Sequence, residues 1–145
     1  MSDGLAAFGG RAALDLLAEN DWAVAFRDRY PVSPGHSLVV PKRAVQSLFE
    51  LPPEEFQSSW ELVAIVRSQL QERYQPDAFN IGINDGLAAG QTIAQAHIHL
   101  IPRYVGDRPD PRGGIRWVLP EHAAYWLPSS NTNKADFNLN SKGDS

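Results

Sequence analysis

The sequence predicts an α+β fold, with an antiparallel sheet of about five strands, one long helix and one or two short helices. Short stretches with strand character recur along the chain, one long stretch has helical spacing, and turn signals separate them. The 145 residues suit one domain and can bury a sizeable core. We expect a single domain over 1–128 and a polar C-terminal tail over 129–145.

The first 40 residues predict a loose start, a short helix and a pair of strands. Residues 1–10 are small and rich in glycine, and the leucines that follow them suggest a short helix ending near Asn20. Residues 22–26 and 36–40 have strand character. Because the Ser-Pro-Gly sequence at 33–35 is a strong turn signal, we expect these two strands to be antiparallel.

The middle of the chain predicts the longest helix. Prolines at 52 and 53 and acidic residues at 54 and 55 mark its start, because proline suits the first turn and carboxylates suit the positive end of a helix. Apolar side chains then recur at helical spacing, which predicts a helix over 54–73 that Pro76 stops. Further strands are predicted over 79–84 and 115–119.

The run from 91 to 103 carries the chemistry that the sequence shows. Gln95, His97 and His99 are separated by two, and apolar residues fill the positions between them. Since alternate side chains of a strand share a face, we expect a polar row on one face and core residues on the other. Two of the four histidines of the chain lie within three residues, which indicates a functional site.

Two kinds of chemistry compete for this row. A His-x-His pair on a strand is a common pair of metal ligands, and His36 could be a third ligand, but acidic residues are sparse nearby. The preceding loop, 86–90, favours phosphate chemistry because its small residues leave backbone N–H groups open to a ligand. Gln91, Thr92 and Gln95 add neutral donors. We therefore expect a phosphate site and no metal ligand set.

The residues from 90 to 101 resemble the signature of the histidine-triad superfamily, in which three histidines alternate with apolar residues. Residues 34–41 resemble an earlier strand of that family, and 84–86 resemble the turn before its loop. The resemblance covers roughly residues 20–120. The branch that it resembles most is the one with dinucleoside polyphosphate hydrolases, and the sequence Asp-Pro-Arg-Gly-Gly-Ile-Arg-Trp at 110–117 looks like a bacterial version. The fold implied is therefore histidine-triad-like.

The resemblance implies a role for each matching position. His97 matches the nucleophile, which would attack the α-phosphorus and form a nucleotidyl-imidazole intermediate that water cleaves, while its second ring nitrogen would donate to a backbone carbonyl. His99 would bond phosphate oxygens and stabilise developing charge, and His36 would support the site. The positions implied to contact the nucleotide, besides His99, are Asp28 at a ribose hydroxyl, Asn84, Gly90, Gln91 and Thr92.

Gln95 departs from the family pattern, because it stands where the first histidine of the triad would be. Glutamine forms hydrogen bonds, but it carries no titratable proton. If the first histidine helps to protonate the leaving group, that step is weakened in this chain. We therefore expect activity to survive and to favour leaving groups that are already acidic, such as a nucleotide.

The predicted function is a nucleotide hydrolase or nucleotidyl transferase acting at the α-phosphate of nucleoside phosphate derivatives, with dinucleoside polyphosphates as the leading substrate. The alternative is a nucleotide-binding module with little turnover, because the triad is incomplete. We expect no tightly bound cofactor, and any Mg²⁺ would arrive on the substrate phosphates. The resemblance also implies a homodimer, with Trp117, Tyr125 and Trp126 as candidate interface residues.

Composition bounds the remaining classes of function. The net charge of −4 disfavours a nucleic-acid-binding surface. The longest apolar runs are only a few residues, so we expect no membrane span. The sequence has no cysteine, which excludes disulfides and thiolate metal sites and fits a cytoplasmic protein.

Overall fold

The computed structural model describes residues 2–128. The chain divides into two compact units, Met1–Asp107 and Arg108–Ser145, and each unit is considered by itself. The polar tail expected over 129–145 lies outside the described residues. The single domain expected over 1–128 stays a prediction.

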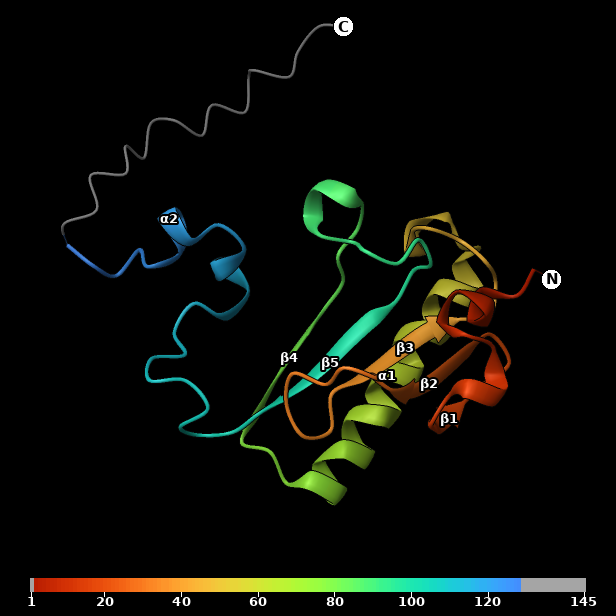
Figure 1. Cartoon of the computed structure of the whole chain (residues 1–145), viewed down its shortest axis with the longest axis horizontal. Helices are drawn as coiled ribbons and strands as arrows, with labels where there is room; N and C mark the ends of the chain where they lie inside the picture. Colours follow the sequence, from red (N-terminus) through yellow and green to blue (C-terminus); the bar gives the residue numbers. More distant parts are fainter. Residues whose placement is uncertain (1, 129–145) are drawn as a thin grey trace, which may run out of the picture. The chain divides into compact units, whose positions relative to one another are not determined.

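The first unit is built on one antiparallel sheet of five strands in the order β1-β2-β3-β5-β4 (Figure 1). Hairpin-like neighbours β1, β2 and β3 follow one another in the chain, whereas β5 lies between β3 and β4. This order places Leu38 of β3 opposite His99 of β5. The strands are Leu16–Glu19 (β1), Ala23–Arg27 (β2), Ser37–Pro41 (β3), Ala78–Gly82 (β4) and Ile98–Arg103 (β5).

One long helix, α1, spans Pro53–Tyr74, so the predicted α+β class and the predicted helix are both confirmed. The helix has proline in its first turn, and Gln75, which caps its C-terminal end, has a left-handed φ of 51°. No helix within residues 2–128 is long and apolar enough to cross a bilayer. In the described part of the chain, the shorter helices are α2 (Pro120–Ala123) and five 3₁₀ segments, η1 (Gly4–Phe8), η2 (Arg11–Ala13), η3 (Leu48–Glu50), η4 (Leu87–Ala89) and η5 (Gly114–Val118).

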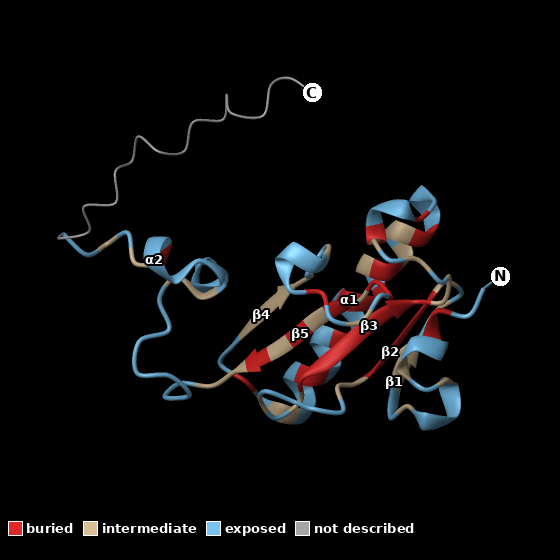
Figure 2. Cartoon of the chain, turned by 45° about the horizontal axis from the view of Figure 1, so that its top comes forward, coloured by how far each residue is buried: buried red, intermediate tan, exposed pale blue. Residues whose placement is uncertain are grey.

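Both faces of the central strands β2 and β3 are covered, as the buried residues along both strands in Figure 2 show. On one face, α1 residues such as Leu62 and Val66 join a core with Val39 and Ile98. On the other face, the N-terminal segment supplies Leu5, Phe8 and Leu14 to a second cluster with Val24, Phe26, Leu38 and Val40. Strands that are buried on both faces read as continuous apolar runs, which explains the sequence of β2 and β3.

Three expectations about local structure were wrong. Residues 1–10 include an ordered 3₁₀ segment, since Leu5 is buried and the N–H of Gly4 donates to the carbonyl of Lys42 at 2.7 Å. The short helix expected before Asn20 is the edge strand β1, because pairing with β2 outweighs the local preference of leucine for helices. The strand expected over 115–119 is largely the 3₁₀ segment η5.

Two arginine–aromatic pairs organise the described part of the second unit. The guanidinium of Arg112 lies 4.7 Å from the ring centre of Trp126, and that of Arg116 lies 4.7 Å from the ring centre of Tyr125. The indole N–H of Trp117 donates to the carbonyl of Arg112 at 2.8 Å. Trp117 and Tyr125 are exposed, whereas Trp126 is partly buried.

Gly35 provides a test of the turn that leads into β3. Its φ is +89°, and a Cβ there would lie 2.9 Å from the ring of Tyr74 and 3.2 Å from Pro102. We expect Gly35→Ala to lower the free energy of unfolding by about 1–3 kcal/mol, measured by urea denaturation. The matched control is Gly82→Ala, where a Cβ meets no atom within 4 Å. Equal stability of the two variants would contradict the strain assigned to Gly35.

Candidate active site

A backbone carbonyl orients the ring of His97. Its Nδ1 lies 2.8 Å from the carbonyl oxygen of Gln95. Because a carbonyl can only accept a hydrogen bond, we place the ring proton on Nδ1, and the neutral ring then carries a lone pair on Nε2. His97 is partly buried and lines a pocket of the first unit. The carbonyl partner expected from the sequence is therefore present, and the free nitrogen is suited to nucleophilic attack.

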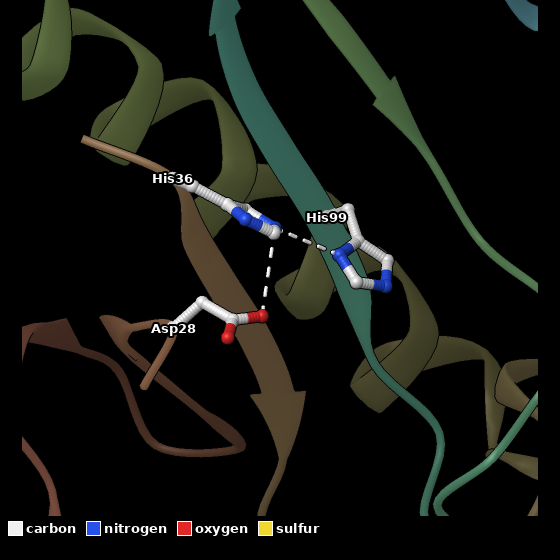
Figure 3. A group of neighbouring side chains, drawn as sticks. All are labelled: Asp28, His36 and His99. Carbon is white, nitrogen blue, oxygen red and sulfur yellow. Dashed lines mark hydrogen bonds and ion pairs between the residues drawn. The ribbon is translucent and has the colours of Figure 1, made fainter. Parts of the chain in front are cut away.

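A chain of hydrogen bonds gives His99 the opposite arrangement. The backbone N–H of Val32 donates to Nδ1 of His36 at 3.1 Å, so the proton of a neutral His36 ring is on Nε2. That Nε2 lies 2.9 Å from Nδ1 of His99, which must then accept (Figure 3). The proton of His99 is left on its own Nε2. His99 therefore offers an N–H donor to a ligand in the pocket that it lines.

Burial keeps both supporting rings neutral. Burial, together with the nearby rings of His97 and His36, lowers the pKa of His99 to about 4. Burial also lowers the pKa of His36, although the carboxylate of Asp28 opposes the shift. The contact of 3.5 Å between Asp28 Oδ2 and His36 Nε2 is therefore not an ion pair at pH 7. At pH 7, His99 is therefore a neutral hydrogen-bond donor.

Asp28, His36 and His99 also have the spacing of a metal ligand set, because one ligand atom of each lies within 4.8 Å of the others (Figure 3). A metal bound to Nε2 of His36 would require the ring proton on Nδ1. The N–H of Val32 already points at that nitrogen, so two donors would face one another. The geometry of this cluster favours a hydrogen-bonded chain over a metal centre.

Ala96, Ile98 and Leu100 join the core with α1, as strand alternation predicts, but of the expected polar row only His97 and His99 line the pocket. Strand β5 begins only at Ile98, because the N–H of Ala96 is paired outside the sheet ladder, with the carbonyl of Val45 at 2.8 Å. The side chain of Gln95 is 3% exposed and does not line the pocket. Gln95 is therefore not placed to contact a leaving group in the pocket, and the expected preference for acidic leaving groups stays a prediction.

The pocket has a volume of about 790 Å³ and brings most of the expected residues together. Gln91 is an exception, since it is buried and holds the loop through bonds to Gly86 N, Gln46 O and Ile93 O. The expected residues that line the pocket are Asp28, His36, Asn84, Gly90, Thr92, His97 and His99.

Sequence reasoning missed the apolar wall that the N-terminal segment contributes. Phe8 lines the pocket together with Leu14 and Phe26. The ring of Phe8 packs edge-on against Phe26, with centroids 5.2 Å apart, and against His97 at 5.7 Å. No local pattern marks Phe8, because it lies in a glycine-rich stretch that resembles a flexible terminus.

Residues 11–106 match the HIT domain family. The asymmetrical bis(5'-nucleosyl)-tetraphosphatase of Schizosaccharomyces pombe is 41% identical over 85 residues, which are 59% of this chain and 47% of that protein. The bis(5'-adenosyl)-triphosphatase of Dictyostelium discoideum is 44% identical over 73 residues, 50% of this chain and 49% of that protein. A crystal structure of a HIT family protein from Bacillus anthracis has a TM-score of 0.64 and 34% identity, and covers 70% of this chain and 71% of that one. The chain thus spans about half the length of the two enzymes.

The low pKa of His99 has a measurable consequence for stability. A histidine in the unfolded chain has a pKa near 6.5, so protons favour the unfolded state as the pH falls from 6.5 towards 4. We expect unfolding experiments in urea to show a loss of up to about 2 kcal/mol between pH 7 and pH 5 from this group. The variant His99→Gln should lose that part of the pH dependence. An unchanged slope in the variant would rule out the assignment.

Proposed function

The chain belongs to the HIT domain family, and from that premise we propose that it cleaves nucleoside phosphate derivatives at the α-phosphate, with dinucleoside polyphosphates as the leading substrate. One observation carries the proposal. The rings of His97 and His99 lie with centroids 4.9 Å apart in one pocket and have opposite proton positions. A nucleophilic lone pair and an N–H donor side by side are the groups that phosphoryl transfer needs. The names of the two related enzymes support the substrate class.

The reaction proposed has two steps. Nε2 of His97 attacks the α-phosphorus, the N–P bond forms, and the bond from phosphorus to the bridging oxygen breaks. The leaving nucleotide takes the bonding electron pair, while the carbonyl of Gln95 stabilises the positive charge that develops on the His97 ring. The N–H of His99 bonds an oxygen of the transferred group. Water, or another acceptor in a transferase reaction, then attacks phosphorus and frees His97.

The rest of the pocket suits a nucleoside. Phe8 and Phe26 form an apolar wall for the base. The Oδ1 atom of Asp28 accepts from the N–H of Tyr30 at 2.8 Å, which leaves Oδ2 to accept from a ribose hydroxyl. Asn84, Gly90 and Thr92 line the pocket and are proposed to contact the phosphates. We propose that any Mg²⁺ is carried in on the substrate phosphates rather than held by the protein.

A second candidate function is a nucleotide-binding module with little turnover. The replacement of the first triad histidine by Gln95 favours it. The presence of both a nucleophilic Nε2 on His97 and an N–H donor on His99 argues against this alternative, because binding alone does not require a nucleophile.

We also propose a homodimer and a cytoplasmic location. The dimer is supported by β4, which forms an edge of the sheet, and by exposed apolar side chains in the second unit, including Trp117, Val118 and Tyr125. The location is supported by the lack of cysteine. Light scattering coupled to gel filtration tests the dimer, and we expect twice the chain mass of 16.0 kDa. A monomer at micromolar concentration would contradict it.

Trapping of the intermediate tests the proposed function. We expect a dinucleoside polyphosphate labelled at the α-phosphorus to leave an acid-labile label on the protein within a single turnover. His97→Ala should abolish the label and lower kcat by at least about a thousandfold, because the nucleophile is lost.

The matched control is His122→Ala, which removes an exposed histidine that does not line the pocket. It should keep both the label and the turnover. A wild-type protein that binds nucleotide tightly but never acquires the label would support the binding module instead.

A further inference from the structure

Gln95 makes an unusually complete set of side-chain hydrogen bonds with the segment that follows β3. Its Oε1 accepts from the N–H of Val45 at 3.1 Å. Its Nε2 donates to the carbonyl of Pro41 at 3.2 Å and to that of Arg43 at 2.9 Å. The side chain is 3% exposed, so its amide has to find hydrogen-bond partners within the protein.

The segment that Gln95 contacts is itself held by the long helix. The guanidinium Nε of Arg43 lies 3.1 and 3.0 Å from the two carboxylate oxygens of Glu55, which is 3% exposed and lies in the first turn of α1. Gly4 closes the other side, since a Cβ there would come within 2.6 Å of Gln95 Nε2. The amide of Gln95 is therefore fixed against rigid neighbours on both sides.

The same residue supplies the carbonyl that orients the nucleophile. The oxygen of Gln95 lies 2.8 Å from Nδ1 of His97, and the next backbone N–H, that of Ala96, donates to the carbonyl of Val45 at 2.8 Å. Side chain and main chain of residues 95 and 96 are thus tied to one segment. These hydrogen bonds fix the direction of the Gln95 carbonyl.

Glutamine suits this position better than histidine. Its amide offers one acceptor and two donors, which matches one N–H and two carbonyls. A neutral imidazole offers one donor and one acceptor, so it could replace only two of these three hydrogen bonds.

We infer that Gln95 is a positioning residue: its side-chain amide holds its own backbone carbonyl against Nδ1 of His97 and thereby keeps Nε2 of that ring free to attack. The structural part of this statement stands on hydrogen bonds alone, and its catalytic part rests on the proposed function. The residue at the first triad position then acts through the tautomer of the nucleophile rather than on the leaving group.

Gln91 provides a matched control within the chain. It is also a buried glutamine, 4% exposed, whose side chain makes three hydrogen bonds to backbone groups. Its bonds hold the loop at 86–91 and do not involve the carbonyl that faces His97. Gln95→Met and Gln91→Met therefore remove three side-chain hydrogen bonds each at similar burial, and only the first variant should disturb His97.

The tautomer of His97 is read from long-range ¹H–¹⁵N spectra of the full-length protein. In the wild type we expect a protonated Nδ1 and a bare Nε2. Gln95→Met should give a mixture of tautomers, whereas Gln91→Met should keep the wild-type pattern. In turnover, Gln95→Met should lower kcat about 10–100-fold with KM within about twofold, because the fault lies in the alignment of the nucleophile.

Gln95→His extends the test to a variant that retains two of the three bonds. It should change the tautomer ratio of His97 in the same direction as Gln95→Met but by less. If Gln95→Met does not fold, this variant replaces it in the experiment. A wild-type pattern of His97 in every folded Gln95 variant would overturn the inference. A disturbed tautomer in a protein whose wild type shows no turnover would instead refute the proposed function and leave the positioning role intact.

Discussion

The chemistry of this protein depends on where the backbone places two ring protons. The carbonyl of Gln95 fixes the proton of His97 on Nδ1, and the N–H of Val32 fixes that of His99, through His36, on Nε2. A carbonyl cannot donate and an amide N–H cannot accept, so these assignments follow from the main chain rather than from any titratable neighbour. Two identical side chains two residues apart thus acquire opposite roles.

The fold makes this arrangement possible by the insertion of β5 between β3 and β4. This strand order places His36, just before β3, beside His99, although the two positions are 63 apart in the sequence. The core behind both strands is closed by α1, and the N-terminal segment closes the other face of β2 and β3. The second covering has a functional result, because Phe8 becomes part of the pocket wall next to His97. Burial by the same walls lowers the pKa of His99 and keeps it a neutral donor.

The parts predicted well from the sequence are those whose signal is local. The helix α1 carries proline, acidic residues and apolar spacing within its own length, and its bounds were predicted to within a residue or so. Continuous apolar runs on either side of a proline-rich turn predict strands β2 and β3. Residues Leu16–Glu19 were predicted to be helical because their strand conformation has no local signal. They form a strand at the edge of the sheet through their pairing with β2.

The sequence by itself determined the α+β class, the long helix, the histidine pair and the likeness to the histidine-triad superfamily, because each rests on spacing within a short run. Only the tertiary structure decided which way Gln95 points, that Phe8 joins the pocket and that His36 reaches His99. Those features depend on contacts between segments that are distant in the chain. Strand alternation predicted a polar row of Gln95, His97 and His99, whereas only the tertiary structure shows that the amide of Gln95 bonds the segment after β3 and does not line the pocket.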